Sequence, residues 1–252
     1  MILIQQAYDS PDPARRRELV EARTRNADAG VFDAIETVDG ADRRASFTDL
    51  FRLAADRFAG EVCVIANSDI AFDASLRLVA PLVAGDRPVL VALTRWDDDA
   101  GPSMEGRVDP GAWRFYSHSQ DAWAFVAGRL PEFPADFLLG IPGCESRMAY
   151  EAAAAGVRIV DPGLSIRTAH LHASGARTWT RRQAYRGPHF FPRLVTAAES
   201  AGAGLLVLRS VWGRREIPLP ATGDAAAFAE ALAAALRGGR IGLRSPLYVR
   251  RR

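Results

Sequence analysis

The chain has 252 residues and a formal net charge of +2, and 48% of its residues are hydrophobic. This length and composition suit one α/β domain with a small appendage, and they allow a sizeable core without disulfides or a structural metal. No long basic block is present, which argues against nucleic acid as the main partner. The sequence contains no lysine, which excludes Schiff-base chemistry and a P-loop lysine but leaves arginine available to bind phosphate.

The two cysteines suggest neither a disulfide framework nor a zinc site. Cys63 lies inside an apolar stretch and Cys144 begins a predicted helix, so we expect a reducing, cytoplasmic environment. The segment Met1–Ser10 lacks a basic region followed by a long apolar core, and Arg77 interrupts the apolar stretch Ile70–Val83. We therefore expect neither a signal peptide nor a membrane span.

Strands and helices alternate along the first part of the chain. Strands are predicted at Ile2–Ala7, Val31–Val38, Val62–Ala66 and Pro88–Thr94, and helices at about Ser10–Asn26, Phe47–Phe58 and Ala74–Val83. Ser46 with Asp49 resembles a capping box before the second helix. This alternation predicts a mainly parallel sheet flanked by helices, with a ligand site at the carboxyl edge of the strands.

The pattern changes after Arg95. Residues Trp96–Pro110 are polar and turn-rich, which predicts a long loop, and we interpret its run of three aspartates, Asp97, Asp98 and Asp99, as solvated charges. Further strands are predicted at Trp113–Phe115, Ala122–Val126, Val157–Val160, Ile166–Leu171 and Leu205–Trp212, and helices at Cys144–Ala155 and Ala225–Leu236. We expect residues 1–200 to form the main domain. Residues 201–252, which end in the basic tail Arg250–Arg252, are expected to form an α/β appendage packed on it; a dimerisation element, and hence a homodimer, is the alternative.

Three polar residues follow the apolar strand Val62–Ala66. Asn67, Ser68 and Asp69 lie where the strand ends, which is the edge of an open α/β sheet that binds ligands. Asp69, with an oxygen of Asn67 or Ser68, could supply the hard ligands that a divalent cation prefers, and a diphosphate would complete the coordination. Turn chemistry is the alternative, since all three side chains can bond to nearby backbone.

Two histidines and several arginines are further candidates for this edge. His170 and His172 are two residues apart on a predicted strand, so both could approach one ion from the same face; the alternative is that one of them is structural. Arg177, with Arg43 or Arg44 from the other side, could neutralise a diphosphate, because guanidinium groups bind phosphate through paired hydrogen bonds. Ordinary surface arginines are the alternative.

Three stretches resemble, in their order, the motifs of GT-A glycosyltransferases. Asn67–Asp69 resembles the DxD motif, with asparagine in place of the first aspartate. Gly143–Pro162 is similar to the acidic helix start, helix and following strand of many members, with Glu145 in place of the second acidic residue of their ED pair. His170–Trp179 resembles the late element that closes over metal and diphosphate, with its spacing met by His172, Gly175 and Arg177. The resemblance spans about Ile2–Trp179 and extends to bacterial proteins assigned as glycosyltransferases.

The resemblance implies a GT-A fold and an enzyme that transfers a sugar from a nucleotide-diphosphate donor to the hydroxyl of a saccharide or other acceptor. It also implies Mn²⁺ or Mg²⁺ as cofactor, and family frequency favours a uridine diphosphate sugar as the donor. Gln6, Tyr8 and Glu36, near the ends of the first two strands, are the proposed nucleoside contacts. Because Asn67 replaces a carboxylate, a weakened or metal-independent site is the alternative to a metal site.

Glu145 and Asp121 are the candidate catalytic carboxylates for an inverting transfer, in which one carboxylate takes the proton of the acceptor hydroxyl. Glu145 is predicted at a helix N-terminus, where the dipole favours its ionised form. Asp121 precedes the aromatic residues Trp123 and Phe125, a setting suited to hydrogen bonding and stacking of a sugar. We assign proton abstraction to Glu145 and sugar positioning to Asp121; a helix-start residue and a turn aspartate without chemistry are the alternatives.

Two rival functions remain open at this point. A nucleotidyltransferase on a related sheet usually has a phosphate loop rich in glycine and lysine after the first strand, and the segment QQAYDSPDP has neither residue. A nucleotide-sugar-binding protein without catalytic activity could keep the same fold.

Overall fold

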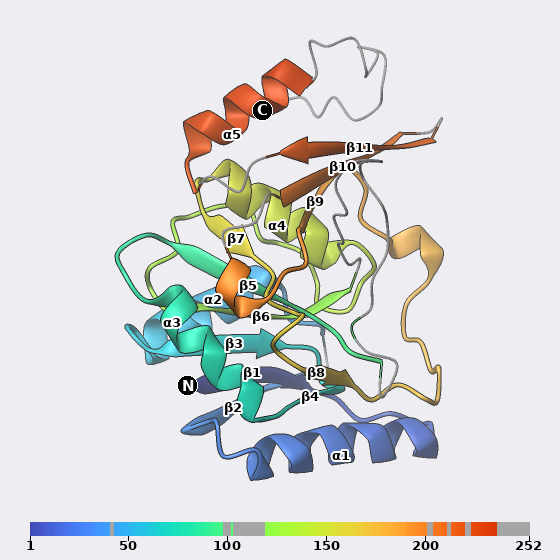
Figure 1. Cartoon of the computed structure of the whole chain (residues 1–252). Helices are drawn as coiled ribbons and strands as arrows, with labels where there is room; N and C mark the ends of the chain where they lie inside the picture. Colours follow the sequence, from blue (N-terminus) through green and yellow to red (C-terminus); the bar gives the residue numbers. More distant parts are fainter. Residues whose placement is uncertain are drawn as a thin grey trace.

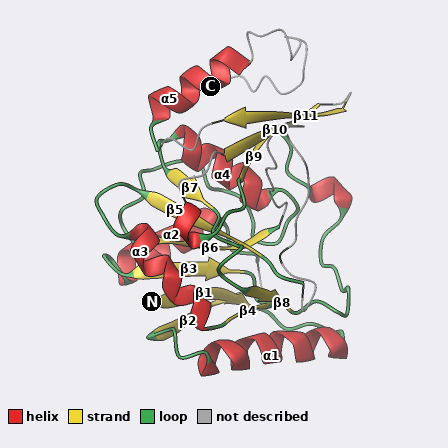
Figure 2. Ribbon diagram, viewed as in Figure 1, coloured by secondary structure: helices red, strands yellow, loops and turns green. Residues whose placement is uncertain are grey.

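The structure is a computed structural model that describes residues 1–40, 43–97, 102, 119–200, 204–210, 213–219 and 223–235. Most of the loop predicted at Trp96–Pro110, the strand predicted at Trp113–Phe115 and the tail Arg250–Arg252 lie outside these residues, as do Asp98 and Asp99. Figure 1 shows a central sheet with helices around it, and Figure 2 gives the same view coloured by secondary structure.

A six-stranded sheet forms the centre, in the order β2-β1-β3-β6-β5-β7. Its strands are β1 (Ile2–Ala7), β2 (Ala34–Asp39), β3 (Val62–Ala66), β5 (Val89–Thr94), β6 (Gln120–Val126) and β7 (Arg158–Val160). β1 is parallel to β2 and β3, and β5 is parallel to β7, whereas β6 is antiparallel to both of its neighbours. The prediction of a mainly parallel α/β sheet is therefore confirmed.

Helices cover both faces of this sheet. They are α1 (Pro13–Asp28), α2 (Phe47–Arg57), the 3₁₀ helix η1 (Ala74–Leu78), α3 (Val79–Val83), α4 (Cys144–Ala154) and α5 (Ala225–Ala235), with short 3₁₀ turns η3 (Arg181–Gln183) and η4 (Ala197–Glu199). Side chains of α2 and α4 share one buried cluster with the sheet, and side chains of η1 and α3 share the other. None of the helices that the structure describes has both the length and the apolar character needed to cross a bilayer.

Successive side chains of the central strands point to opposite faces of the sheet, which explains why the core has two layers. Ile4 of β1 and Ile65 of β3 belong to the cluster with α2 and α4, whereas their neighbours Leu3 and Val64 belong to the cluster with η1 and α3. A strand that is apolar at every position is therefore buried on both faces. The continuous apolar runs in the sequence are therefore central strands.

The ends of the elements agree with the predictions in part. The capping box of Ser46 and Asp49 is present at the start of α2. α1 begins at Pro13 rather than Ser10, because the side chain of Asp12 is its N-cap and accepts hydrogen bonds from two backbone N–H groups. The helix predicted at Ala74–Val83 is divided into η1 and α3.

Three strands have no counterpart among the predicted elements: β4 (Ile70–Phe72), β9 (Pro188–Pro192) and β11 (Gly213–Leu219). β4 has only three residues, and proline at both ends of β9 argues against a strand in a sequence-based prediction. β4 pairs in antiparallel fashion with β8 (Thr168–His170), and this pairing sets Ile70 opposite His170. The small two-stranded sheet thus brings the segment after β3 next to the histidines.

The C-terminal part is joined to the main domain by strand pairing, because β10 (Gly204–Ser210) pairs with β9. β10 lies between β9 and β11 in a three-stranded antiparallel sheet. Phe228 of α5 packs edge-on against Tyr150 of α4 and Phe190 of β9. The expected boundary at residue 200 therefore falls between two strands of one sheet, and Figure 1 shows α5 beside α4.

Candidate functional site

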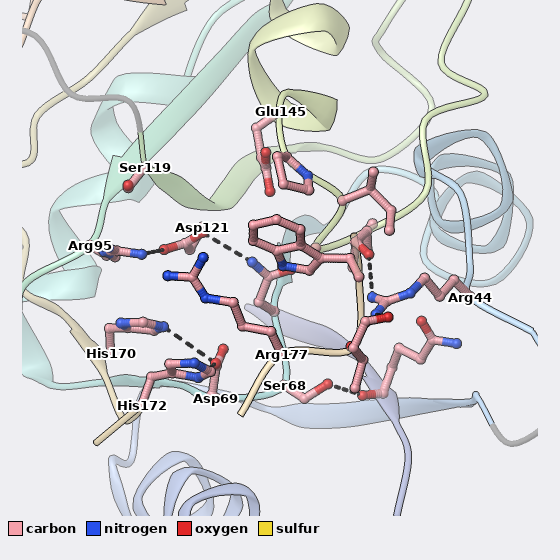
Figure 3. Close-up of a pocket in the computed structure, with 18 of the residues that line it drawn as sticks. Arg44, Ser68, Asp69, Arg95, Ser119, Asp121, Glu145, His170, His172 and Arg177 are labelled. Carbon is pink, nitrogen blue, oxygen red and sulfur yellow. Dashed lines mark hydrogen bonds and ion pairs between the residues drawn. The ribbon is translucent and has the colours of Figure 1, made fainter. Parts of the chain in front are cut away.

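A pocket of about 860 Å³ lies where β1 and β3 end. Since β6 is antiparallel, its first residues rather than its last reach this edge, which explains why Asp121 joins the pocket. Figure 3 shows these side chains converging from the strand ends, the start of α4 and the segment after β8. The predicted site residues that line the pocket are Gln6, Tyr8, Arg44, Asn67, Ser68, Asp69, Asp121, Glu145, His170, His172 and Arg177.

Asp69 is the centre of a compact cluster of charged and polar groups. Its Oδ2 accepts a hydrogen bond from Nη2 of Arg15 at 2.6 Å, and it lies 3.3 Å from Nε2 of His170 and 3.4 Å from Nδ1 of His172. The two imidazole rings are stacked, with centroids 5.2 Å apart. As predicted from their spacing, both histidines approach one group from the same side.

The pairing of β4 with β8 produces this geometry. The backbone N–H of Leu171 donates to the carbonyl of Asp69 at 2.9 Å, and the N–H of His170 donates to the carbonyl of Trp96 at 3.0 Å. These bonds fix the backbone on both sides of the histidines. In addition, Nδ1 of His170 lies 3.3 Å from Oδ1 of Asp97, so Asp97 orients that ring.

The electrostatic balance keeps Asp69 ionised. Burial alone would raise the pKa of Asp69, but the contacts of His170 and His172 and the charges of His170 and Arg15 outweigh burial and hold that pKa below its ordinary value. For His170, burial lowers the pKa, whereas the contact with Asp69 and the charges of Asp121 and Asp69 raise it, and the net pKa lies above its ordinary value. The cluster therefore offers a carboxylate anion as a ligand.

Asp69, His170 and His172 fit a metal ion. One ligand atom from each residue lies within 4.8 Å of the others, and the buried Nδ1 of His172 makes no hydrogen bond of good geometry with a described residue, since its contact with Oδ2 of Asp69 is 3.4 Å long. A buried polar atom without a partner costs free energy, and a bound cation would satisfy it. Two imidazoles with one carboxylate suit Mn²⁺ or another first-row transition ion better than Mg²⁺, which prefers oxygen ligands.

Arg15 belongs to this site although the sequence analysis did not select it. It lies in the first turn of α1, and Leu19, Ala22 and Asn26 continue the same buried face at helical spacing. A charged residue on the buried face of a helix that follows the first strand is the signal that could have identified it. Arg15 is also held by the hydroxyl of Tyr8, which accepts from Nε at 3.2 Å and from Nη2 at 3.1 Å.

A second cluster joins the two candidate carboxylates. Nδ2 of Asn67 donates a hydrogen bond to Oδ1 of Asp121 at 3.1 Å, and the Asn67 side chain lowers the pKa of the nearby Glu145 carboxyl. An aspartate at position 67 would place a third carboxylate against these two. The departure from the DxD pattern therefore has a physical reason, because the amide at this position supplies a donor where a carboxylate would repel.

Both carboxyl groups hold protons more tightly than usual. Burial, with the charge of Asp121, raises the pKa of Glu145 to about 7. Burial also raises the pKa of Asp121, although the positive charges of His170 and Arg95 oppose the shift. Nη1 of Arg95 lies 3.6 Å from Oδ2 of Asp121, and Arg95 lines the pocket although it was not among the predicted site residues.

Two further arginines that line the pocket, Arg44 and Arg177, differ in their contacts. Arg44 donates to the carbonyl of Leu139 at 2.8 Å and to the Thr178 side chain, so it ties two pocket segments together. Arg177 is exposed, and its guanidinium carbon lies 5.0 Å from the ring centroid of Trp179. Among the described residues no carboxylate forms an ion pair with Arg177, so its charge is available to an anionic ligand.

Three of the residues proposed to contact the ligand form hydrogen bonds with other protein groups in the pocket wall. Nε2 of Gln6 donates to the carbonyl of Arg43 at 2.7 Å, and its Oε1 accepts from the N–H of Ala45 at 3.1 Å. The Ser68 hydroxyl donates to the carbonyl of Gln6. With Tyr8 bonded to Arg15, these side chains shape the pocket, and their amide and hydroxyl groups already have protein partners.

Two predicted contacts lie outside the pocket. Glu36 sits in the middle of β2 and pairs with Arg57 of α2, so it does not reach the strand end as proposed. Arg43 is exposed and pairs with Asp49 at 2.8 Å, because the carboxylate of the capping box attracts it away from the pocket. Of the two neighbouring arginines, only Arg44 lines the pocket.

A scan of the chain against protein-family models finds no match, and a search of curated proteins finds none either. Neither comparison identifies a family, so the resemblance to GT-A glycosyltransferases stays an expectation from the sequence motifs.

Proposed function

We propose that this protein is a GT-A-type glycosyltransferase that moves a sugar from a nucleotide-diphosphate donor, favoured as a uridine diphosphate sugar, to an acceptor hydroxyl. One observation carries the proposal. The three motifs that resemble the family are far apart in the sequence, yet Asp69, Glu145 and Arg177 line one pocket. A ligand site at the carboxyl ends of the strands is also where open α/β sheets bind nucleotides.

The donor side of the pocket is the cluster around Asp69. Asp69, His170 and His172 would hold a divalent cation, which would neutralise the negative charge of the diphosphate. Arg177 would bind a phosphate oxygen directly, because its guanidinium is exposed in the pocket and carries no ion pair with a described residue. Bidentate contact of arginine with phosphate combines charge with directional hydrogen bonds.

The acceptor side of the pocket contains the carboxylates of Asp121 and Glu145, which lie near Asn67. Glu145 is suited to take the proton of the acceptor hydroxyl, since a general base works best when its pKa lies near the working pH, and burial raises the pKa of Glu145 to about 7. Asp121, held by the amide of Asn67, would position the sugar through hydrogen bonds.

A transfer assay with product analysis tests the proposal. The protein would be incubated with a panel of nucleotide sugars, with and without simple acceptors, in Mn²⁺, Mg²⁺, Fe²⁺ or EDTA. Release of the nucleoside diphosphate in Mn²⁺, and its loss in EDTA, supports a metal-assisted glycosyltransferase. Fe²⁺ is included because two histidines and one carboxylate are also the ligands of non-haem iron oxygenases.

The same assay separates the rivals. A nucleotidyltransferase acting on a nucleotide sugar would break the bond between the two phosphates, so that the nucleotidyl group passes to the acceptor and a sugar 1-phosphate leaves instead of a nucleoside diphosphate. A non-catalytic binding protein would be stabilised by nucleotide sugars without releasing any product, because a ligand that binds only the folded state raises its stability. Absence of both binding and turnover across the panel would contradict the proposed function.

A further inference from the structure

Asp69 is the one carboxylate among the three candidate metal ligands, and a fixed positive charge already pairs with it. Nη2 of Arg15 lies 2.6 Å from Oδ2 of Asp69, and the two side chains are only 7% and 8% exposed. The carbonyl of Leu171 also accepts from Arg15 at 3.2 Å, and the Tyr8 hydroxyl accepts two further bonds. Arg15 is therefore a fixed part of the site and not a mobile surface charge.

Among the described residues that line the pocket, negative charge does not exceed positive charge. The lining contains as many guanidinium groups as carboxylates, namely Arg15, Arg44, Arg95 and Arg177 against Asp9, Asp69, Asp121 and Glu145. Glu18 also pairs with Arg15, at 3.0 Å, but it does not line the pocket, and its carboxylate accepts hydrogen bonds from the backbone and hydroxyl of Ser174. A divalent cation alone would thus enter a formally neutral pocket beside a buried guanidinium.

An anionic ligand changes this balance. A diphosphate brings several negative charges and oxygen ligands for the cation, and it can also bind Arg177, which has no ion pair with a described residue. Cation and anion would then compensate each other in a pocket that favours neither one alone. Such mutual dependence between two ligands is a coupling free energy, and it must be reciprocal.

We infer that a divalent cation and an anionic phosphate ligand bind to this site cooperatively, and that Arg15 is the residue that imposes the dependence. This inference rests on the proposed metal-assisted function. Arg15 acts through Asp69: it repels a cation that arrives without an anion, and it competes with that cation for the Asp69 carboxylate. Arg15 is therefore a positioning residue and not a ligand to the cation. Its charge makes the affinity for the cation depend on the bound anion.

Equilibrium dialysis of Mn²⁺, with free Mn²⁺ measured on the protein-free side, tests the inference without any need for turnover. Uridine diphosphate is the anionic probe, and uridine is its uncharged match. For the wild-type protein we expect uridine diphosphate to tighten Mn²⁺ binding by at least about fivefold, the lower end of typical coupling between two ligands. Uridine should leave Mn²⁺ binding unchanged.

Arg15→Gln and Arg15→Met, each checked for folding, test the role of the charge. Both variants should bind Mn²⁺ alone more tightly than the wild type and should show a smaller gain with uridine diphosphate. A residue with a merely structural role would weaken Mn²⁺ binding in both conditions. Arg25→Gln is the matched control, because Arg25 lies on the same helix in an exposed ion pair with Glu21 at 2.7 Å, and it should behave as wild type.

The outcomes separate this inference from the proposed function. If the coupling is present in the wild type but the Arg15 variants keep it in full, the inference about Arg15 is wrong while the metal-assisted site remains. If the wild type binds Mn²⁺ equally well with and without uridine diphosphate, the inference and the metal-assisted binding of the donor are both wrong. If the wild type binds no Mn²⁺ even with uridine diphosphate, both the inference and the metal-assisted function are wrong. Should neither Arg15 variant fold, Arg15 is required for the fold rather than for the coupling, and the inference is wrong.

Discussion

Asn67 and Asp121 are joined by two hydrogen bonds at the edge of the sheet. The Asn67 side chain donates to Oδ1 of Asp121 at 3.1 Å, and its backbone N–H donates to the Asp121 carbonyl at 3.0 Å. The pair connects the end of β3 to the start of the antiparallel strand β6. The same side chain acts on the pKa of Glu145, so Asn67 influences both candidate catalytic carboxylates.

Asn67→Asp should therefore destabilise the protein in a way that depends on pH. It replaces a hydrogen-bond donor by a third carboxylate next to Asp121 and Glu145, and we expect a loss of about 1 to 3 kcal/mol, typical of unsatisfied or repelling buried polar groups. The loss should be larger at pH 8 than at pH 5, since protonation relieves the repulsion. Thermal unfolding at both pH values measures it, with Asn67→Ala as the uncharged control. Equal losses for Asn67→Asp at the two pH values would contradict this role.

The raised pKa of Glu145 predicts a pH dependence of stability in the wild type. The folded protein keeps this proton up to about pH 7, whereas an ordinary glutamate loses it near its usual pKa of 4.5. The stabilising contribution is thus complete below that usual value and is lost as pH rises through about 7, with a magnitude of about 1 to 3 kcal/mol. Glu145→Gln should flatten this part of the curve.

Denaturant unfolding between pH 4.5 and 8 checks the Glu145 assignment. Asp161 is a useful comparison, because burial likewise raises its pKa to about 7, but Thr94 and Gly163 surround it and it does not line the pocket. Asp161 therefore contributes a second, separate part of the decrease in the free energy of unfolding as the pH rises. A curve for Glu145→Gln that is parallel to the wild-type curve would show that Glu145 is not the titrating group.

The two carboxylates should differ in kinetics. Loss of a general base typically costs about a hundredfold to ten-thousandfold in rate, so Glu145→Gln should lose kcat while it still binds donor. Asp121→Asn should change substrate affinity together with rate, because its proposed role is to position the sugar. Donor titration and turnover of both variants measure the difference. An inactive Asp121→Asn with normal donor binding, beside an active Glu145→Gln, would exchange the two roles.

Arg177→Ala should weaken uridine diphosphate about 10- to 100-fold and leave uridine within about twofold, because hydrogen bonds to a charged group are worth about 1.5 to 3 kcal/mol. Titration calorimetry with the two ligands measures the effect. Arg43→Ala is the matched control, since Arg43 is exposed, pairs with Asp49 and does not line the pocket. Equal weakening of uridine diphosphate and uridine by Arg177→Ala would identify Arg177 as a structural residue.

The mainly parallel sheet could be predicted from the sequence because its central strands contain continuous apolar runs. Ile4, Ile65 and their neighbours are buried on both faces, and this leaves a clear signal in a single sequence. The direction of β6 could not be predicted, because a short apolar run such as Ala122–Val126 looks the same in both directions. That direction is nevertheless what brings Asp121 to the site.

The site was predictable where it depends on spacing along one segment. His170 and His172 are two positions apart, and both imidazoles lie beside Asp69 as expected, although β8 ends at His170 and His172 follows it. Contacts between distant segments were not predictable: Arg15 meets Asp69 across 54 positions in the sequence, and Glu36 turns to Arg57. Asp69 was expected at an exposed edge, but it is 6% exposed, so removal of its charge would leave Arg15 poorly compensated.

The most direct test of the proposed site is the binding of uridine diphosphate to wild-type protein and to Asp69→Asn, each in Mn²⁺ and in EDTA. Asparagine is chosen because it keeps the size of the side chain while removing the charge that would hold the cation. Glu36→Gln is the control, since Glu36 was a proposed contact that lies outside the pocket. We predict that Mn²⁺ strengthens uridine diphosphate binding to the wild type and to Glu36→Gln, and that this gain is lost in folded Asp69→Asn. A folded Asp69→Asn protein that keeps the full gain from Mn²⁺ would contradict this prediction.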